Sequence, residues 1–191
     1  MERTRLDTNK AIQAAAVLLR AEGGEMSYFR LIKLMYLADL RSLKETGARI
    51  TQDLVVAMKH GNVLSRLLNL AKGQDIETDR WAAHIEREGY RIKLLTSPGN
   101  SELSSYEIDT LNRVADELSG VDDFTVAELT HDVAWNRATD VGRRLSDNTK
   151  VLEVALEDLI DAADRSDDRE RIAEYERESA ALDRFFAGLG G

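Results

Sequence analysis

Apolar residues recur at three- and four-residue intervals along most of the chain, which is the spacing of amphipathic helices. The segment from Ser27 to Glu45 has the widest apolar face, which predicts a central and well-buried helix. We expect Gly23, Gly47 and Gly73 to end helices. The pattern predicts helices over residues 8–21, 27–45, 63–72, 104–118, 125–131, 147–164 and 168–187.

A shorter region follows the alternating period of a β-strand. Residues 81–96 place Trp81, Ile85 and Ile92 between polar neighbours, and the turn sequence 86–89 ends in glycine, which predicts a β-hairpin. Residues 54–58 fit a short strand or a helical turn, because periodicity cannot decide over so short a run. The predicted fold is therefore mainly α with a small β-hairpin, a compact helical domain followed by a C-terminal helical extension.

Polar residues at the expected helix starts support these assignments. Asp7 or Thr8 can cap the first helix. The pairs Ser104 and Glu107, and Thr125 and Glu128, both have the spacing of a capping box. We expect Trp135 to follow on a further short helix or turn.

The charge distribution separates the last part of the chain from the rest. The chain has 35 acidic and 26 basic residues, a net charge of −9, and residues 150–191 alone hold 12 acidic and 6 basic side chains. We therefore expect a domain at 1–146 and an acidic helical pair at 147–191. The negative balance argues against a general nucleic-acid binder, because phosphate contacts need a basic face.

The absence of several residue types and motifs narrows the function further. The chain has no cysteine, which excludes disulfides, thiolate metal sites and cysteine nucleophiles. It has no apolar run that could span a membrane and no apolar N-terminal signal, so we expect a cytoplasmic protein without membrane contact. Phosphate-loop, dinucleotide-binding and serine-hydrolase motifs are absent. We expect no enzyme activity, no catalytic residue, no cofactor and no metal.

His131 is the one histidine that has an adjacent carboxylate in the sequence, Asp132. Neighbours on a helix point to different faces, which favours a structural His131 over an acid–base pair. The opposing hypothesis, a hydrolase or nucleotide-modifying enzyme, requires His131 to line an open pocket with a second polar group in reach. Arg137, Arg143 and Arg144 form a thin cationic patch that a DNA-binding autoregulator would use, and helix-end charge explains them more simply.

The last predicted helix carries the candidate partner-binding residues. Ile172, Tyr175, Ser179, Leu182 and Phe186 follow one another at three- and four-residue steps. Such a seam fits an antiparallel helix pair, a homodimer through this helix, or docking on a protein partner. Aromatic and apolar anchors dominate protein interfaces. The candidate anchors are Tyr175, Leu182, Phe185 and Phe186.

Several segments together resemble the Panacea antitoxin domain, the SocA-like family found in phage-associated proteins. Residues 31–39, LIKLMYLAD, resemble its KLLYLAD helix. ITQD at 50–53 followed by AMKHGNV at 57–63 resembles its I-T-x-D…A-x-x-x-G-P-V stretch. LTHD at 129–132 with Trp135 resembles its L-T-H-E…W signature, and Ser104 with Glu107 resembles its LS-x-x-E helix start. The order and spacing agree over about residues 9–140.

The resemblance implies the antitoxin of a type II toxin–antitoxin pair, which neutralises a cognate protein toxin by direct binding. The alternative that the resemblance implies is a proteolytic adaptor, which delivers the toxin to a ClpXP-type protease. We expect the family-motif residues to stabilise the domain through buried hydrogen bonds. Asn62 replaces the family's proline, which predicts a softened turn, and the region after about residue 145 lies outside the shared motifs. The family-motif residues are Tyr36, Asp39, Gly61, Thr130, His131 and Trp135.

Overall fold

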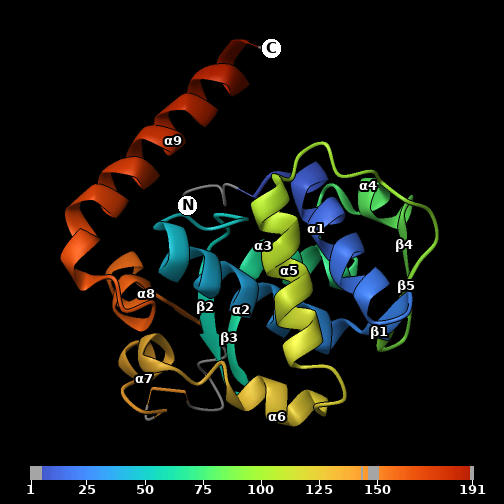
Figure 1. The fold of residues 1–191 in the computed structure, drawn as a ribbon, viewed down its shortest axis with the longest axis horizontal. Helices are drawn as coiled ribbons and strands as arrows, with labels where there is room; N and C mark the ends of the chain where they lie inside the picture. Colours follow the sequence, from blue (N-terminus) through green and yellow to red (C-terminus); the bar gives the residue numbers. More distant parts are fainter. Residues whose placement is uncertain (1–5, 143, 146–150, 190–191) are drawn as a thin grey trace.

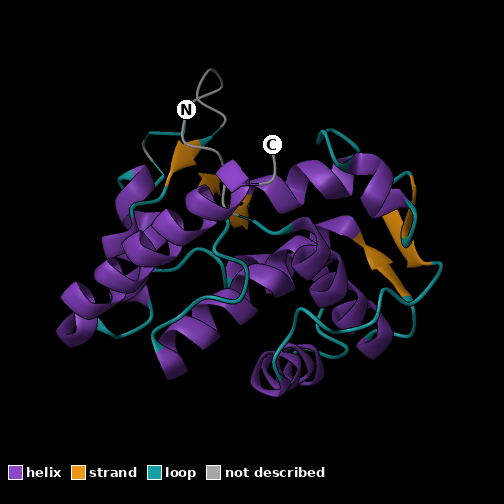
Figure 2. Ribbon diagram, turned by 90° about the horizontal axis from the view of Figure 1, so that it is seen from above, coloured by secondary structure: helices purple, strands orange, loops and turns teal. Residues whose placement is uncertain are grey.

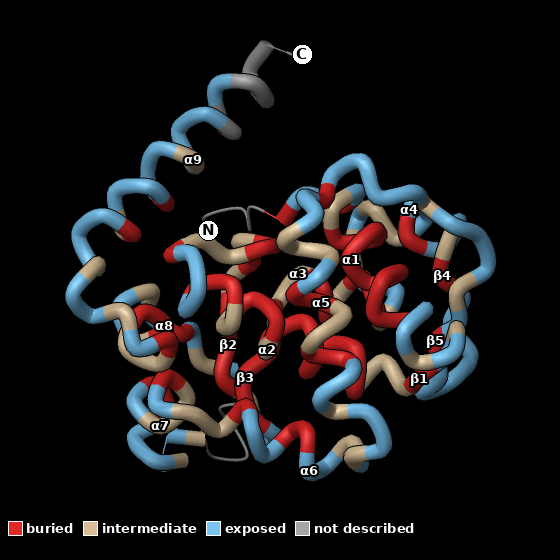
Figure 3. The backbone as a smooth tube through the Cα atoms, viewed as in Figure 1, coloured by how far each residue is buried: buried red, intermediate tan, exposed pale blue. Residues whose placement is uncertain are grey.

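Three helices form the centre of the protein. The computed structural model describes residues 6–142, 144–145 and 151–189, apart from several side chains near the end of the last helix. Helices α1 (Thr8–Ala21), α2 (Tyr28–Thr46) and α5 (Ser105–Glu117) pack against one another. Asp7 and Ser27 cap α1 and α2, and Ser104 forms the predicted capping box with Glu107. Buried residues occur all around α2, which is why it lies at the centre (Figure 3).

Two small antiparallel sheets lie apart from each other with helices between them (Figures 1 and 2). The first has the order β1 (Glu25–Ser27), β5 (Arg91–Leu94) and β4 (Ile85–Glu88). The second has the order β3 (Gly61–Leu64), β2 (Val55–Met58) and β6 (Leu152–Glu153). The predicted hairpin is confirmed as β4 and β5, and the open choice at residues 54–58 is settled as a strand.

The expectation of a single hairpin is wrong, because β1 extends it and a second sheet exists. Residues 63 and 64 belong to β3, so helix α3 covers only Ser65–Lys72. Trp81 lies on the short helix α4 (Thr78–Ala82) rather than on a strand. The apolar run at residues 63–64 was assigned to a helix because a fully buried strand has no alternating pattern of apolar and polar residues.

Two further helices precede the C-terminal region. Helix α6 (Asp123–Glu128) begins two residues earlier than expected, because Asp122 caps it by accepting hydrogen bonds from the backbone of Phe124 and Thr125. The capping box predicted for Thr125 and Glu128 is therefore wrong. Helix α7 (Val133–Thr139) carries Trp135 and is capped by Asp132, which accepts a hydrogen bond from the Trp135 backbone.

The C-terminal region differs from the single helix predicted over 147–164. Residues 147–150 of that prediction lie outside the described residues, and 152–153 form β6 against β2. Helix α8 (Leu156–Ala162) packs on α7 and α2. A 3-10 turn, η1 (Ser166–Asp168), leads into α9 (Arg169–Leu189), which extends away from the body (Figure 1). The division at residue 146 into two domains stays a prediction.

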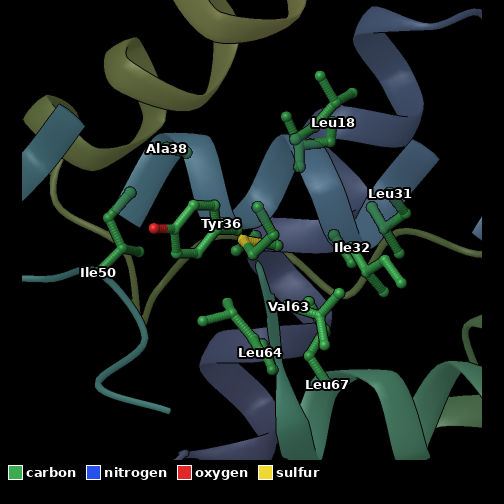
Figure 4. Packing of buried hydrophobic residues seen from close by; sticks show 14 of the residues in the cluster. Leu18, Leu31, Ile32, Tyr36, Ala38, Ile50, Val63, Leu64 and Leu67 are labelled. Carbon is green, nitrogen blue, oxygen red and sulfur yellow. The ribbon is translucent and has the colours of Figure 1, made fainter. Parts of the chain in front are cut away.

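The apolar core runs from α1 through α2 to α3 and the second sheet. Tyr36 lies among Ile50, Val63, Leu64 and neighbouring apolar side chains (Figure 4). These residues come from segments far apart in the sequence, so the core ties the second sheet to the helices. Among the described residues, no helix is both long and apolar enough to cross a membrane.

Candidate functional site

A buried hydrogen-bond cluster joins α2, the second sheet and the start of α7. The Tyr36 hydroxyl donates to Asp132 Oδ2 at 2.5 Å. Asn62 Nδ2 donates to the Tyr36 hydroxyl at 3.0 Å and to Asp132 Oδ1 at 3.1 Å. Burial raises the pKa of Tyr36 well above its ordinary value, and the Asp132 carboxylate raises it further. The arrangement keeps the phenol protonated as a donor, so it stabilises the fold.

Asn62 strengthens the β2–β3 turn rather than softening it. Besides its two side-chain bonds, its backbone N–H donates to the Thr130 carbonyl at 3.1 Å. A proline at this position lacks the N–H and could not make that bond. The expectation of a softened turn is therefore wrong, and residues 59–60 are held against the segment before α7.

Lys33 and Gly61 complete this cluster from the inside. Lys33 Nζ donates to the His60 and Asn62 carbonyls at 2.5 and 3.0 Å, and to Thr130 Oγ1 at 3.2 Å. Gly61 has φ of +90°, and a Cβ there would lie 2.0 Å from Thr130 Oγ1 and 3.2 Å from Lys33 Nζ. Only glycine combines this backbone conformation with so close an approach.

His131 and Trp135 cover the outside of the same turn. Trp135 Nε1 donates to the Met58 carbonyl at 2.8 Å. The His131 and Trp135 rings meet edge to face with centroids 4.4 Å apart. His131 Nε2 lies 3.3 Å from the Lys59 carbonyl, and Nδ1 lies 3.7 Å from Oε2 of the exposed Glu128. The ring therefore packs against backbone and tryptophan, while the neighbouring Asp132 carboxylate faces Tyr36 and Asn62.

A pocket of about 790 Å³ opens beside this cluster. Lys33, His60 and Trp135 line it, whereas His131 does not. The enzyme hypothesis required His131 to line an open pocket, and this geometry gives that hypothesis no support. Among the residues that the structure describes, no group of histidine or carboxylate side chains is arranged to hold a metal ion.

A second buried cluster attaches α9 to the end of α2. Asp39 accepts hydrogen bonds from the backbone and hydroxyl of Thr51 at 2.9 and 2.6 Å. Arg49 donates from Nε to Glu176 of α9 at 3.0 Å and from Nη1 to the Asp53 carbonyl at 2.8 Å. Burial raises the pKa of Asp39, and the nearby Arg49 guanidinium opposes that rise. Asp39 therefore belongs to a different cluster from the other family-motif residues.

Two more contacts anchor the first half of α9. The Ile172 side chain is buried against the body, and the Ser179 hydroxyl donates to Gln52 Oε1 at 3.2 Å. The predicted seam is thus turned toward the body at Ile172 and Ser179, with Glu176 between them. The other two described members of the seam, Tyr175 and Leu182, do not face the body and stay 46% and 57% exposed. Phe185 is 61% exposed, and the Phe186 side chain lies outside the described residues.

Part of the C-terminal acidic excess is engaged in ion pairs within the chain. Asp161 pairs with Arg137 and Arg169, and Asp168 pairs with Arg165 and Arg171. The pairing also neutralises Arg137, a member of the predicted cationic patch. Arg144 donates to the Ala138 carbonyl, and Arg143 lies outside the described residues.

Sequence reasoning missed Lys33, Asn62 and Arg49 as members of these clusters. Lys33 carried a signal, because the residues one helical turn before and after it, Phe29 and Leu37, are apolar and a lysine interrupts that face. Asn62 and Arg49 carried none, since their partners are distant in sequence. Motif spacing did find five of the residues that meet around the β2–β3 turn, namely Tyr36, Gly61, Thr130, His131 and Trp135.

Comparison with known proteins identifies the family. No curated protein and no solved structure matches the chain. The family model described as "Antitoxin SocA-like, Panacea domain" matches residues 31–136, which is more than half of the chain. The match begins in α2 and ends in α7, so it covers the β2–β3 turn and the motif residues around it. The chain therefore belongs to the SocA-like antitoxin family and contains a Panacea domain.

Proposed function

We propose that this protein is the antitoxin of a type II toxin–antitoxin pair and neutralises a protein toxin by direct binding. Membership of an antitoxin family supports the general role. The motif residues form internal hydrogen bonds, so a partner needs a different, exposed surface. A binding protein of this kind requires no reaction chemistry of its own, and its expected site is the cytoplasm.

The observation that carries the proposal is the exposed apolar face of α9. Tyr175 and Leu182 are seven residues apart, which places them on one side of the helix. The helix projects from the body, and most of its length is exposed (Figure 3). Large apolar side chains on a projecting helix are typical anchors for a partner groove. The apolar face supports binding better than the acidic excess, because Asp161, Asp168 and Glu176 are already paired with arginines of the same chain.

The proposal is tested by co-expression with the protein encoded by the neighbouring reading frame. We expect the full chain to restore growth, and Leu182→Asp or Tyr175→Asp to abolish the rescue. Each substitution should weaken binding by about 30-fold, as loss of an interface anchor does. Ile76→Asp is the matched control, because Ile76 is 94% exposed and lies away from α9. Full rescue by both folded α9 variants would exclude α9 as the toxin-binding surface.

A protease-deficient host separates direct neutralisation from delivery to a protease. Direct binding predicts rescue in cells that lack ClpXP, whereas a proteolytic adaptor fails there.

Light scattering of the full chain and of Leu182→Asp tests the homodimer. A mass that falls from dimer to monomer in the variant would assign the α9 face to self-association instead.

A further inference from the structure

The pocket beside the motif cluster has the shape of a small-molecule site. It lies between the first turns of α2, the β2–β3 turn, α3, Trp135 of α7 and the segment that follows α7. Its volume of about 790 Å³ falls within the common range for small-ligand pockets, about 300–1,000 Å³. Family-motif segments form part of its wall, including Lys33, His60 and Trp135, whereas the proposed toxin contact on α9 does not line it.

Aromatic rings form much of the pocket wall and are held in place by their neighbours. Tyr28 stacks on Tyr90 with centroids 5.7 Å apart. Phe29 packs against Phe124 at 6.2 Å, and Trp135 is fixed by its bond to the Met58 carbonyl. Rings that are already positioned offer flat apolar surfaces to a ligand at little entropic cost.

The side chains of the pocket lining that can carry a positive charge have no acidic counterpart among the described lining residues. Lys33, Lys59, His60 and Lys72 line it, and the described lining contains no acidic side chain. This is unusual in a chain whose acidic residues outnumber its basic ones by 35 to 26. A wall of one charge sign favours a ligand of the opposite sign.

Lys33 supplies a second reason to expect an anion. Its side chain is buried, and its three polar partners are two backbone carbonyls and one hydroxyl. Among the described residues, no carboxylate lies within ion-pair distance of Nζ. Burial lowers the pKa of Lys33 to about 7, because loss of water around the ammonium disfavours its charged form. An anion in the pocket would supply the missing opposite charge.

We propose that this pocket binds a small organic anion that has a flat aromatic or apolar body. The body would lie against Phe29 and Trp135, and the negative charge would face Lys59 and Lys72, with the buried Lys33 ammonium behind the pocket wall. A single concave cavity fits such a molecule better than a nucleic acid, which requires an extended basic face. The site is independent of toxin binding by α9.

Two matched dyes test the charge requirement. The first is 8-anilinonaphthalene-1-sulfonate, and the second is N-phenyl-1-naphthylamine, which has the same aromatic body without the sulfonate. We expect the folded full chain to bind the sulfonate dye at least about tenfold more tightly, measured by fluorescence titration. Equal affinities, or no binding of the sulfonate dye, would overturn the proposal.

Substitutions locate the bound dye. Lys59→Gln and Lys72→Gln should each weaken sulfonate binding by about threefold to tenfold while leaving the neutral dye unaffected. Lys44→Gln is the matched control, because Lys44 is exposed on α2 and does not line the pocket. If both pocket variants bind the sulfonate dye as tightly as the control does, the dye lies elsewhere and the proposal fails.

Competition identifies the class of occupant. We expect indole-3-acetate or a nucleoside monophosphate to displace the dye. Displacement only by an acidic, tryptophan-containing peptide would make the pocket a protein-docking site and would overturn the small-ligand proposal. Dye affinity that falls as the chain dimerises in light scattering would assign the pocket to a second copy, with the same consequence.

Discussion

Two buried polar clusters lie along α2, and they differ in what surrounds them. The first joins Lys33 and Tyr36 to the β2–β3 turn and α7 inside the apolar core. The second joins Asp39 and Arg49 to Glu176 at the base of the projecting α9. The hydrogen bonds of the first cluster lie inside the apolar core and stabilise the fold. The bonds of the second cluster lie at the base of a projecting helix and fix the position of that helix. Damage to the first cluster should therefore unfold the body, and damage to the second should release α9.

The largest effect is expected for Gly61→Ala. The new Cβ would lie 2.0 Å from Thr130 Oγ1, at a φ of +90° that alanine rarely adopts. We expect a loss of about 3 to 5 kcal/mol in the free energy of unfolding, measured by urea denaturation. Gly89→Ala is the control, because Gly89 also has positive φ but has nothing within 4 Å of the new Cβ. Gly89→Ala should lower the free energy of unfolding by about 1 kcal/mol. Equal losses in the two variants would contradict the close packing at Gly61.

Glu176→Ala should act on α9 alone. It leaves Arg49 buried without its α9 carboxylate, which we expect to cost about 2 kcal/mol of the free energy that holds α9 on the body. Hydrogen exchange should show that loss in the amides of 169–179 and little change in 31–40. Glu178→Ala, at an exposed position of the same helix, should leave both regions unchanged. Equal loss of protection in α2 would show that the two clusters unfold together.

Lys33 makes the first cluster sensitive to pH. Between its folded pKa of about 7 and its ordinary value of 10.5, the unfolded chain holds a proton that the folded chain has released. The free energy of unfolding should therefore rise with pH across this window, by about 2 kcal/mol from pH 7 to pH 9. Denaturation of Lys33→Met at both pH values should lack this rise, whereas exposed Lys44→Met should retain it. A rise of the same size in Lys33→Met would assign the effect to other groups.

The smallest effect on stability is expected for Leu182→Ser. Leu182 is 57% exposed on the projecting part of α9, so its removal creates no cavity. We expect a change of less than about 0.5 kcal/mol in the free energy of unfolding. Thermal denaturation of the variant checks this, and a loss above 1 kcal/mol would show that Leu182 packs on the chain itself.

Local signals in the sequence were sufficient for the long helices and their caps. Ser104 acts on Glu107 three positions away, so the sequence alone revealed its role. The sequence also reduced the cap of α1 to Asp7 or Thr8, of which Asp7 is the one that acts. Strand β6 was hidden because it pairs with β2 across about one hundred residues, whereas β3 was missed because its apolar run was included in the helix predicted over 63–72. Strand pairing over such a distance leaves no periodic trace in either segment.

The candidate site was predictable to a similar extent. The family motifs named residues that do meet around the β2–β3 turn, although spacing alone said nothing about which groups touch. The bond between Arg49 and Glu176 lies beyond any local pattern, because its partners are 127 positions apart. The seam on α9 was visible, but which of its residues face the body depends on that distant bond.

The two-residue strand β6 has a consequence for any shortened form of the chain. It pairs with Val56 and Ala57, and the Val154 N–H donates to the Val55 carbonyl at 3.0 Å. Without it, β2 becomes an edge strand with unpaired backbone groups, and such edges serve as templates for aggregation. A chain ending at residue 146 would therefore precipitate or self-associate whether or not α9 binds a toxin. Leu152 and Glu153 therefore cover the edge of β2 and protect it from pairing with another chain, a role separate from recognition of a partner.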